Sequence, residues 1–340
     1  MKKKHWKILF ISSVCVIGVA LFIFIGYQKY ENKSYSTLGK IMKGEPIFTF
    51  TSVGDYGASE KTAEVLNLIN DLNPDFHIAL GDFGYETDEE EWCRFTRDII
   101  GEDLSFELIA GNHDSGMGGE KSVSKYVKCM PSMMPEISGI YGEQYYFDYP
   151  SDNPVLRIVL ISPDINYEGG RYDYDEKSDN WKWLEYSIDS ARDSGIKWLI
   201  AGSHKPCLNL GSRGCEITEE LEEYLIDKKV DVILHGHDHN YQRTKQLSCF
   251  DESEYLTDCA TEGCGKDSLY DKNGGTVIIT AGTGGRPLYD LVLGEAKTKY
   301  FASFDDGSYG TIRVSVYEDV LAGEFIDIRG QIKDRFLIKN

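Results

Sequence analysis

Short apolar runs that end in polar turns recur along the first half of the chain, and they constrain its fold more than any other feature. Three of these runs span residues 47–53, 76–80 and 106–110. The intervening segments 58–72 and 89–100 have the patterns of helices. This alternation of strands and helices predicts a sheet with parallel strands, and ligands bind such sheets at the carboxyl ends of the strands.

The second half of the chain is richer in strand patterns than in helical ones. Helices are expected around 181–188 and over 217–226, while residues 117–141 show no clear pattern. The sequence therefore predicts one α/β domain over residues 47–335, in which two mixed sheets pack face to face with helices outside. The further strands are expected over residues 144–149, 156–161, 198–201, 230–234, 241–247, 276–281, 311–316 and 321–328.

Side chains that bind metal ions gather at the ends of the predicted strands. A mixed set of oxygen and nitrogen ligands without thiolates suits iron, manganese or zinc. The set is too large for one catalytic ion with an open position, so two ions are expected, with Asp82 as the bridging ligand. His237 and His239 alone are weak evidence, since polar turn residues beside a core strand are the alternative. The full set comprises Asp55, Asp82, Asn112, His204, His237 and His239.

Five motifs occur in an order that resembles the calcineurin-like metallophosphoesterases. They are Asp-x-Gly at 55–57, Gly-Asp-x-x-Tyr at 81–85, Gly-Asn-His-Asp at 111–114, the strand histidine His204, and Gly-His-x-His at 236–239. Tyr85 narrows the resemblance to the purple acid phosphatases, including the small tartrate-resistant type. The resemblance covers about residues 47–285 and implies a four-layer α/β/β/α fold. Ala201 departs from the valine usual at that position in the family.

The resemblance also implies a role for each site residue. One metal ion would bind Asp55, Asp82, Tyr85 and His239, and the other would bind Asp82, Asn112, His204 and His237. The ions would be Fe(III) paired with Fe(II), Zn or Mn. Catalysis would use Asp82 as the bridge and His113 as an acid near the substrate. Without its motif, Tyr85 would be taken as a packing residue.

Other conspicuous residues are expected to stay outside the chemistry. His235 is expected only to orient its turn, and His5 and His77 are expected to have no function. The glycines at 282–285 are interpreted as a plain turn. The alternative is that they lie next to the substrate phosphate.

The leading hypothesis is an acid phosphatase that hydrolyses phosphate monoesters on small molecules or phosphoproteins. The second hypothesis keeps the site but makes it a phosphodiesterase acting on nucleotides or lipid headgroups. A third is a binding module that retains a relic site.

The N-terminus predicts a membrane anchor. Lysines at positions 2, 3, 4 and 7 precede a run without charge over residues 8–27, which is long enough to span a bilayer. The positive charges would keep the N-terminal end of the anchor, residues 1–30, in the cytoplasm. The stalk at 31–46 and the remaining chain would then lie outside the cytoplasm. A cleaved signal peptide, and hence a secreted protein, is the alternative.

Charge and cysteine usage fit an extracytoplasmic enzyme. Beyond residue 30 the chain has 31 basic and 56 acidic residues, which argues against nucleic acid as a partner. Seven cysteines follow Cys15 of the apolar run, so one thiol should remain free if the others pair. A Cys207–Cys215 disulfide is expected from their short separation. At least one further bridge is expected among Cys249, Cys259 and Cys264.

Overall fold

The structure is a computed structural model that describes residues 44–118, 120–167, 170–250, 259–261 and 269–340. The expected anchor and all but the end of the expected stalk lie outside the described residues, as does Cys264. Among the helices of the described residues, none combines the length and the apolar character needed to cross a membrane.

The first sheet has seven strands in the order β13, β18, β17, β16, β1, β2, β3. Strand β1 lies parallel to β2 and antiparallel to β16, and β2 lies parallel to β3. The strand bounds are β1 (Phe48–Val53), β2 (Phe76–Ala79), β3 (Ser105–Leu108), β13 (Leu269–Asp271), β16 (Gly310–Val316), β17 (Val320–Asp327) and β18 (Ile332–Lys339).

The second sheet has nine strands in the order β12, β11, β14, β10, β9, β6, β5, β4, with β15 paired to β11. Its centre is parallel, because β10 runs alongside both β9 and β14 in the same direction. The strand bounds are β4 (Ser138–Ile140), β5 (Gln144–Tyr149), β6 (Leu156–Leu160), β9 (Trp198–Ser203), β10 (Val232–His235), β11 (Tyr241–Leu247), β12 (Ala260–Thr261), β14 (Thr276–Ala281) and β15 (Phe301–Asp305).

The helices begin at polar caps that the sequence supplies. Ser59 accepts a hydrogen bond from the amide of Thr62, and Thr62 bonds back, which satisfies amides at the start of α2. Asp88 and Ser178 cap α3 and α5 in a similar way. The bounds are α2 (Glu60–Leu72), α3 (Glu89–Ile100), η1 (Asn112–Asp114), α4 (Val123–Cys129), α5 (Asp179–Asp193), α6 (Glu219–Asp227) and α8 (Glu295–Thr298), with a small hairpin of β7 (Asn166–Tyr167) and β8 (Gly170–Arg171).

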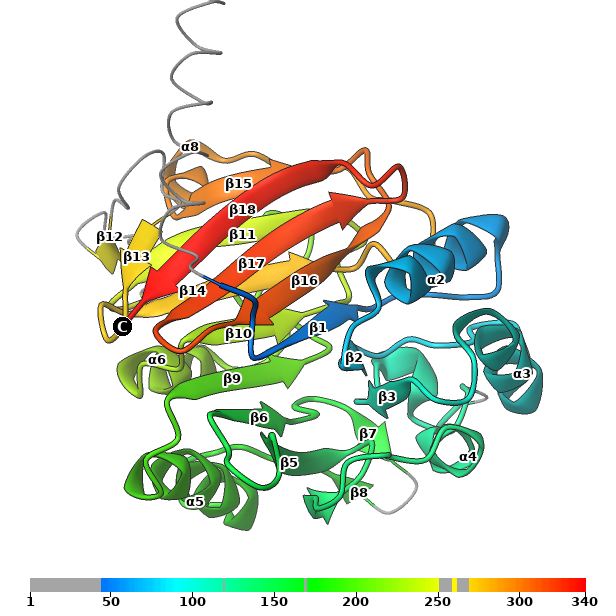
Figure 1. The fold of residues 1–340 in the computed structure, drawn as a ribbon, viewed down its shortest axis with the longest axis horizontal. Helices are drawn as coiled ribbons and strands as arrows, with labels where there is room; N and C mark the ends of the chain where they lie inside the picture. The colour runs from blue at the N-terminus through cyan, green and yellow to red at the C-terminus, as the bar shows by residue number, and fades with distance from the viewer. Residues whose placement is uncertain (1–43, 119, 168–169, 251–258, 262–268) are drawn as a thin grey trace, which may run out of the picture. The chain divides into compact units, whose positions relative to one another are not determined.

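Three large apolar clusters hold these elements in four layers. The largest cluster packs Phe50 and Ile312 of the first sheet with Ile200 and Ile279 of the second. The other two clusters join α2, α3 and α4 to the first sheet and α5 and α6 to the second. In Figure 1 the red and orange strands β16 to β18 overlie the yellow-green strands of the second sheet. The predicted α/β/β/α sandwich of two mixed sheets is therefore confirmed.

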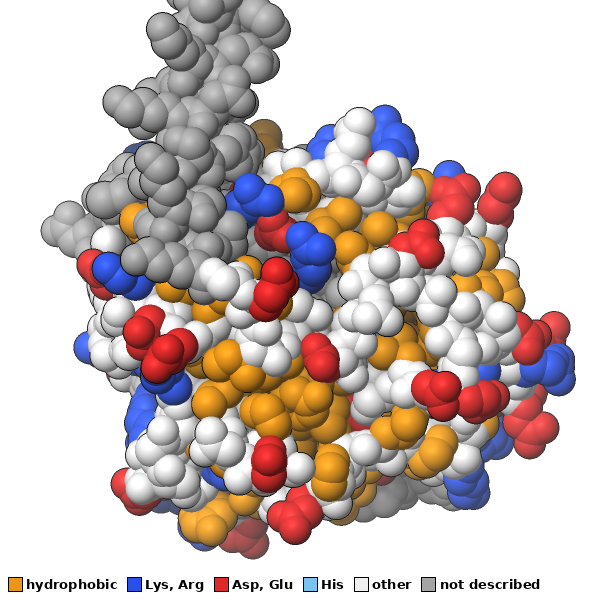
Figure 2. Space-filling model, viewed as in Figure 1, with side chains coloured by type: hydrophobic (Ala, Val, Ile, Leu, Met, Phe, Trp, Pro, Cys, Tyr) orange, Lys and Arg blue, Asp and Glu red, His pale blue; other side chains and the backbone are white. Residues whose placement is uncertain are grey.

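The structure adds elements that the sequence patterns did not predict. Helix α4 and strand β4 lie in the segment 117–141, which showed no clear pattern. Strand β18 pairs with β17 and continues to Lys339, so the fold extends past residue 335, where the domain was expected to end. Acidic side chains are spread over the face of the described residues seen in Figure 2 rather than gathered in one patch.

Candidate metal centre

Four residues of the proposed ligand set occupy the left-handed region of backbone conformation, which is uncommon for residues other than glycine. Their φ angles are 67° at Asp55, 56° at Asp82, 49° at Tyr85 and 69° at His237. Hydrogen bonds between the turns hold them: the amide of Asp55 donates to the carbonyl of Gly81 at 3.0 Å. The amide of His237 donates to Oδ2 of Asp55 at 2.7 Å. Such strain concentrates at functional sites.

Asp55, Tyr85 and His239 form the first group of potential ligands. The Tyr85 hydroxyl donates to Oδ1 of Asp55 at 3.1 Å and lies 3.3 Å from Nε2 of His239. The same Nε2 lies 3.2 Å from Oδ1 of Asp55. The ring of Tyr289 stacks on His239 with 4.0 Å between centroids. The Tyr85 hydroxyl, Oδ1 of Asp55 and Nε2 of His239 therefore lie close together, and they are atoms of the kinds expected to coordinate one metal ion.

Asp82, Asn112, His204 and His237 form the second group. Nε2 of His204 lies 3.0 Å from Nδ1 of His237, 3.2 Å from Oδ1 of Asn112 and 3.4 Å from Oδ1 of Asp82. Asp82, His204 and His237 are all buried, and their ligand atoms lie within 4.8 Å of one another. The structure thus brings together all seven residues that the sequence proposed as ligands, with Asp82 placed among the second group.

The outward-facing ring nitrogens of the three histidines each have a partner. Nδ1 of His204 lies 2.7 Å from the carbonyl of Leu80, and Nδ1 of His239 lies 2.9 Å from the carbonyl of Pro287. Nε2 of His237 contacts a carboxylate oxygen of Glu216. Partners of this kind fix the tautomer of a metal-binding histidine and direct its free nitrogen inward. The donor set therefore fits metal ions in orientation as well as in chemistry.

Asp114 supports the second group from outside and was not singled out from the sequence. It is fully buried and accepts hydrogen bonds from the amides of Asp82, Phe83 and Gly111 at 2.6, 3.1 and 2.8 Å. Burial and the neighbouring Asp82 raise its pKa. A side chain at Gly111 would place Cβ 2.1 Å from Oδ1 of Asp82, so only glycine permits this approach.

Charge compensation within the cluster is strong. Burial would raise the pKa of Asp82, but His204 and His113 lower it below its usual value. Burial opposes a charge on His204, yet Asp82 and Asp55 raise the pKa of His204 to about 9. Burial, Asp55 and Asp82 together raise the pKa of Tyr85 far above its usual value. A phenolate at Tyr85 therefore requires additional positive charge, which a bound metal ion would supply.

His113 lies at the open side of the cluster. Its side chain is 38% exposed, and its Nδ1 lies 2.8 Å from Oε2 of Glu120. Its Nε2 lies 3.9 Å from Oδ2 of Asp82, and its amide donates to Oδ1 of Asp82 at 2.9 Å. The ring can therefore reach a substrate while its second nitrogen is held by a carboxylate. Glu120 was not identified from the sequence, because it belongs to no motif.

His5 lies outside the described residues, and His77 and His235 have hydrogen-bond partners other than the proposed ligands. His77 is buried between the Thr51 and Tyr56 hydroxyls, at 2.7 Å from each, and burial lowers its pKa to about 3. His235 bonds Ser203 at 3.0 Å. The glycines at 282–285 form a turn against the Asp55 turn, where the amide of Gly284 donates to the carbonyl of Gly54 at 2.9 Å.

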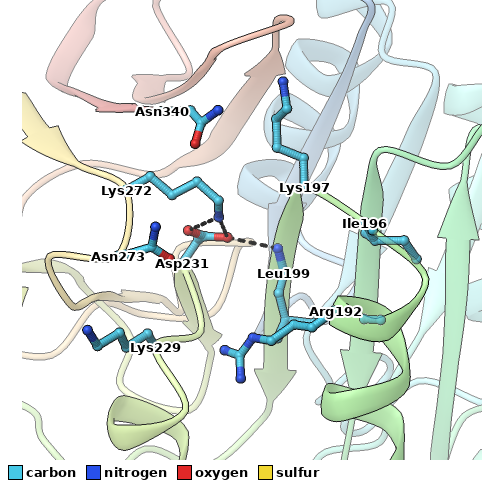
Figure 3. Close-up of a pocket in the computed structure, with 11 residues that line it drawn as sticks. Arg192, Ile196, Lys197, Leu199, Lys229, Asp231, Lys272, Asn273 and Asn340 are labelled. Carbon is cyan, nitrogen blue, oxygen red and sulfur yellow. Dashed lines mark hydrogen bonds and ion pairs between the residues drawn. The ribbon is translucent and has the colours of Figure 1, made fainter.

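A cavity of about 340 Å³ lies at the other, amino-terminal ends of β9 and β10 (Figure 3). Figure 3 shows Lys272 beside Asp231, with Nζ 2.7 and 2.8 Å from the two carboxylate oxygens. Arg192, Lys197 and Lys229 also line this cavity. Since the ligand cluster occupies the carboxyl ends of the same strands, the cluster and not this cavity is the candidate site.

Comparisons with known proteins agree with this site. A sequence profile of the family described as Calcineurin-like phosphoesterase matches residues 47–241. The chain is 28% identical over 214 residues to Purple acid phosphatase 18 of Arabidopsis thaliana, across 59% of this chain and 45% of that protein. It is 25% identical over 284 residues to a purple acid phosphatase of Glycine max, across 77% of this chain and 56% of that protein. The chain thus spans about half the length of the curated relatives it matches.

Solved structures show the same fold. Purple acid phosphatase PPD1 from yellow lupin (Lupinus luteus) seeds aligns with a TM-score of 0.64 at 18% identity, covering 87% of this chain and 54% of that chain. A dimetal phosphatase from Danio rerio aligns with a TM-score of 0.50 at 15% identity, over 87% of this chain and 99% of that chain. With its ordered motifs, its four-layer fold and the profile match, the chain belongs to the calcineurin-like phosphoesterase family, and purple acid phosphatases are among its relatives.

Proposed function

We propose that this protein is a metal-dependent acid phosphatase that hydrolyses phosphate monoesters at a dinuclear centre. The observation that carries the proposal is the arrangement of two ligand groups around Asp82. Its Oδ1 lies 3.4 Å from Nε2 of His204 in the second group, and its negative charge contributes to the raised pKa of Tyr85 in the first. In this proposal Asp55, Asp82, Tyr85 and His239 would hold an Fe(III) ion, and Asp82, Asn112, His204 and His237 would hold Fe(II), Zn or Mn.

Bound ions of this kind supply Lewis acidity and lower the pKa of a bound water, which slow phosphate-ester hydrolysis requires. The residues of the chain do the rest. The carbonyls of Leu80 and Pro287 and the carboxylate of Glu216 orient the histidines, and burial keeps bulk water from the ligands. His113 donates a proton from Nε2 to the leaving oxygen, while the carboxylate of Glu120, 2.8 Å from Nδ1, holds the ring in position.

The proposed location is outside the cytoplasm, on a membrane anchor formed by residues 1–30. Three disulfides support an oxidising compartment: Cys93–Cys129, Cys207–Cys215 and Cys249–Cys259. Phosphorylated small molecules or phosphoproteins are the proposed substrates. The acidic excess beyond residue 30 disfavours nucleic acids.

The experiment compares p-nitrophenyl phosphate with bis-p-nitrophenyl phosphate on the purified full-length protein, with metal content measured on the same sample. Higher kcat/KM for the monoester, at about two metal ions per chain, is the expected result. Preference for the diester would favour the phosphodiesterase hypothesis. A protein that contains no metal and hydrolyses neither ester would support the third hypothesis, a binding module with a relic site.

A further inference from the structure

The loop that follows His204 carries an arginine to the edge of the metal centre. This loop, residues 205–217, is closed by the Cys207–Cys215 disulfide. The buried Asn209 stabilises it by donating to the carbonyls of Cys207 and Gly214 at 3.1 and 3.3 Å. Arg213 extends from this loop, with Nη1 2.7 Å from Nε2 of His237. Because its side chain is 44% exposed, it is accessible from solvent as well as from the site.

Arg213 and Glu216 compete for the same ring nitrogen of His237. Nε2 of His237 contacts both Arg213 and a carboxylate oxygen of Glu216. A ring nitrogen in a neutral imidazole either donates or accepts, so it satisfies only one of these partners at a time. A metal ion on the inward-facing Nδ1 requires the proton on Nε2, and that proton then belongs to Glu216.

With His237 bound to Glu216, the guanidinium of Arg213 keeps a charged neighbour but lacks an acceptor on the ring. Oε1 of Glu216 lies 3.5 Å from Nη1 of Arg213, close enough to attract it and too far for a strong hydrogen bond. The five donors of the guanidinium are thereby kept at the edge of the centre, where they can meet an incoming anion.

Two other cationic side chains near the centre, Arg286 and Lys205, form ion pairs with carboxylates. Arg286 donates to Glu86 at 2.9 Å and stacks on the ring of Tyr85, with 3.9 Å from its guanidinium carbon to the ring centroid. Lys205 donates to Asp164 at 2.7 Å. A phosphate dianion that approaches the carboxylates of Asp55 and Asp82 experiences repulsion, and an arginine fork can offset it with two parallel hydrogen bonds.

We propose that Arg213 binds the phosphoryl oxygens of the substrate and of the product phosphate, and that Glu216 positions it. This inference rests on the proposed function, since it names the residue that recognises the phosphate at that site. No motif contains Arg213, which is why sequence reasoning did not identify it.

The test measures binding of inorganic phosphate to the full-length, metal-loaded protein by calorimetry, with metal content determined in parallel. We expect Arg213→Ala to weaken phosphate binding about tenfold or more, because charge-assisted hydrogen bonds to an anion are lost. Metal content should stay unchanged. Arg213→Lys should restore only part of the affinity, since an ammonium group lacks the fork. With a monoester substrate the loss should appear mainly in KM.

Arg171→Ala is the matched control, because Arg171 is 49% exposed and pairs with Asp164 at 2.8 Å rather than with a ligand residue. It should bind phosphate as the unaltered protein does. Unchanged phosphate affinity in Arg213→Ala would overturn the proposal. So would a proportional loss of metal, which would mean that Arg213 only holds His237. A protein that binds phosphate through Arg213 but hydrolyses no ester would refute the proposed function alone.

Discussion

Among single residues, Asp82 and His113 should separate metal binding from chemistry. We expect Asp82→Asn to lower turnover at least about a hundredfold and to reduce metal content, since a neutral amide bridges cations poorly.

His113→Ala should lower kcat by about 10²-fold or more while metal content stays the same, because it removes a proton donor. Both variants need turnover and metal measured together. Asp179→Asn, on the exposed start of α5, serves as the control. Near-normal turnover in Asp82→Asn would contradict the bridging role.

Tyr85 carries the distinction between a purple acid phosphatase and other metallophosphoesterases. A phenolate is a hard anionic ligand that favours Fe(III), and a trivalent ion keeps its water deprotonated at lower pH. We therefore expect a purple protein with an acidic optimum, and loss of the visible band in Tyr85→Phe. Absorption spectra and iron content test this. A colourless, iron-free and fully active preparation would reduce the assignment to a generic dimetal centre.

Local motifs account for the site residues that the sequence predicted. Each ligand lies in the turn segment that follows a strand, so its place near the strand end can be inferred from a few neighbouring positions. Long loops carry Glu216, Glu120 and Arg213 to the centre. Loops have no periodic sequence pattern that indicates where a side chain will lie. Asp114 did lie in a recognised motif, where it directly follows the ligand Asn112 and the proton donor His113.

At the scale of elements, a buried ion pair joins β11 to β18. Arg243 donates to both carboxylate oxygens of Asp334, at 2.6 and 3.0 Å. Burial would raise the pKa of Asp334, but Arg243 and Tyr241 lower it. We expect Asp334→Asn to reduce the free energy of unfolding by about 3 kcal/mol near neutral pH, because it removes the negative charge that balances a buried guanidinium.

The pH dependence of that loss has a definite sign. A carboxyl whose pKa is lowered by folding stabilises the fold fully above its unfolded pKa of about 3.9, and less as pH falls through the folded pKa. Urea unfolding should therefore show the two proteins converging in stability below about pH 4. Asp319→Asn, which affects an exposed pair with Lys197, should change stability by less than about 1 kcal/mol. A difference between Asp334→Asn and the unaltered protein that does not change with pH would argue against this account.

Elements with clear periodicity were predictable and the others were not. Helix α3 spans the expected residues, and β5, β11 and β14 begin and end as predicted. Strand β18 was missed because half of its residues are charged and its first residues are exposed, so the buried face is hard to recognise.

The Cys207–Cys215 disulfide is confirmed, as is a bridge within the later cysteine group. Cys93–Cys129 was not predicted, because spacing across 36 positions carries no information on pairing.

On the scale of the whole molecule, topology across a membrane is the main expectation. The lysine cluster before residues 8–27 should retain the start of the chain in the cytoplasm and export residues 31–340. A reporter that functions only after export, fused after residue 32, should be active. A reporter active only in the cytoplasm, fused at the same position, should give no signal. The reverse pattern would contradict an extracytoplasmic phosphatase.

Strand β1 lies between β2 and β16, so its two edges are completed at different times during synthesis. Its partner β2 follows within about 25 residues, whereas β16 begins at Gly310. At about 5–20 residues per second, roughly 10 to 50 s separate the two events. During that interval the emerging β1–β2–β3 unit presents an open edge to other chains, which is a known aggregation hazard. Shielding by a chaperone on the ribosome, or rapid passage through an export channel, would then determine how much of this protein reaches its folded form.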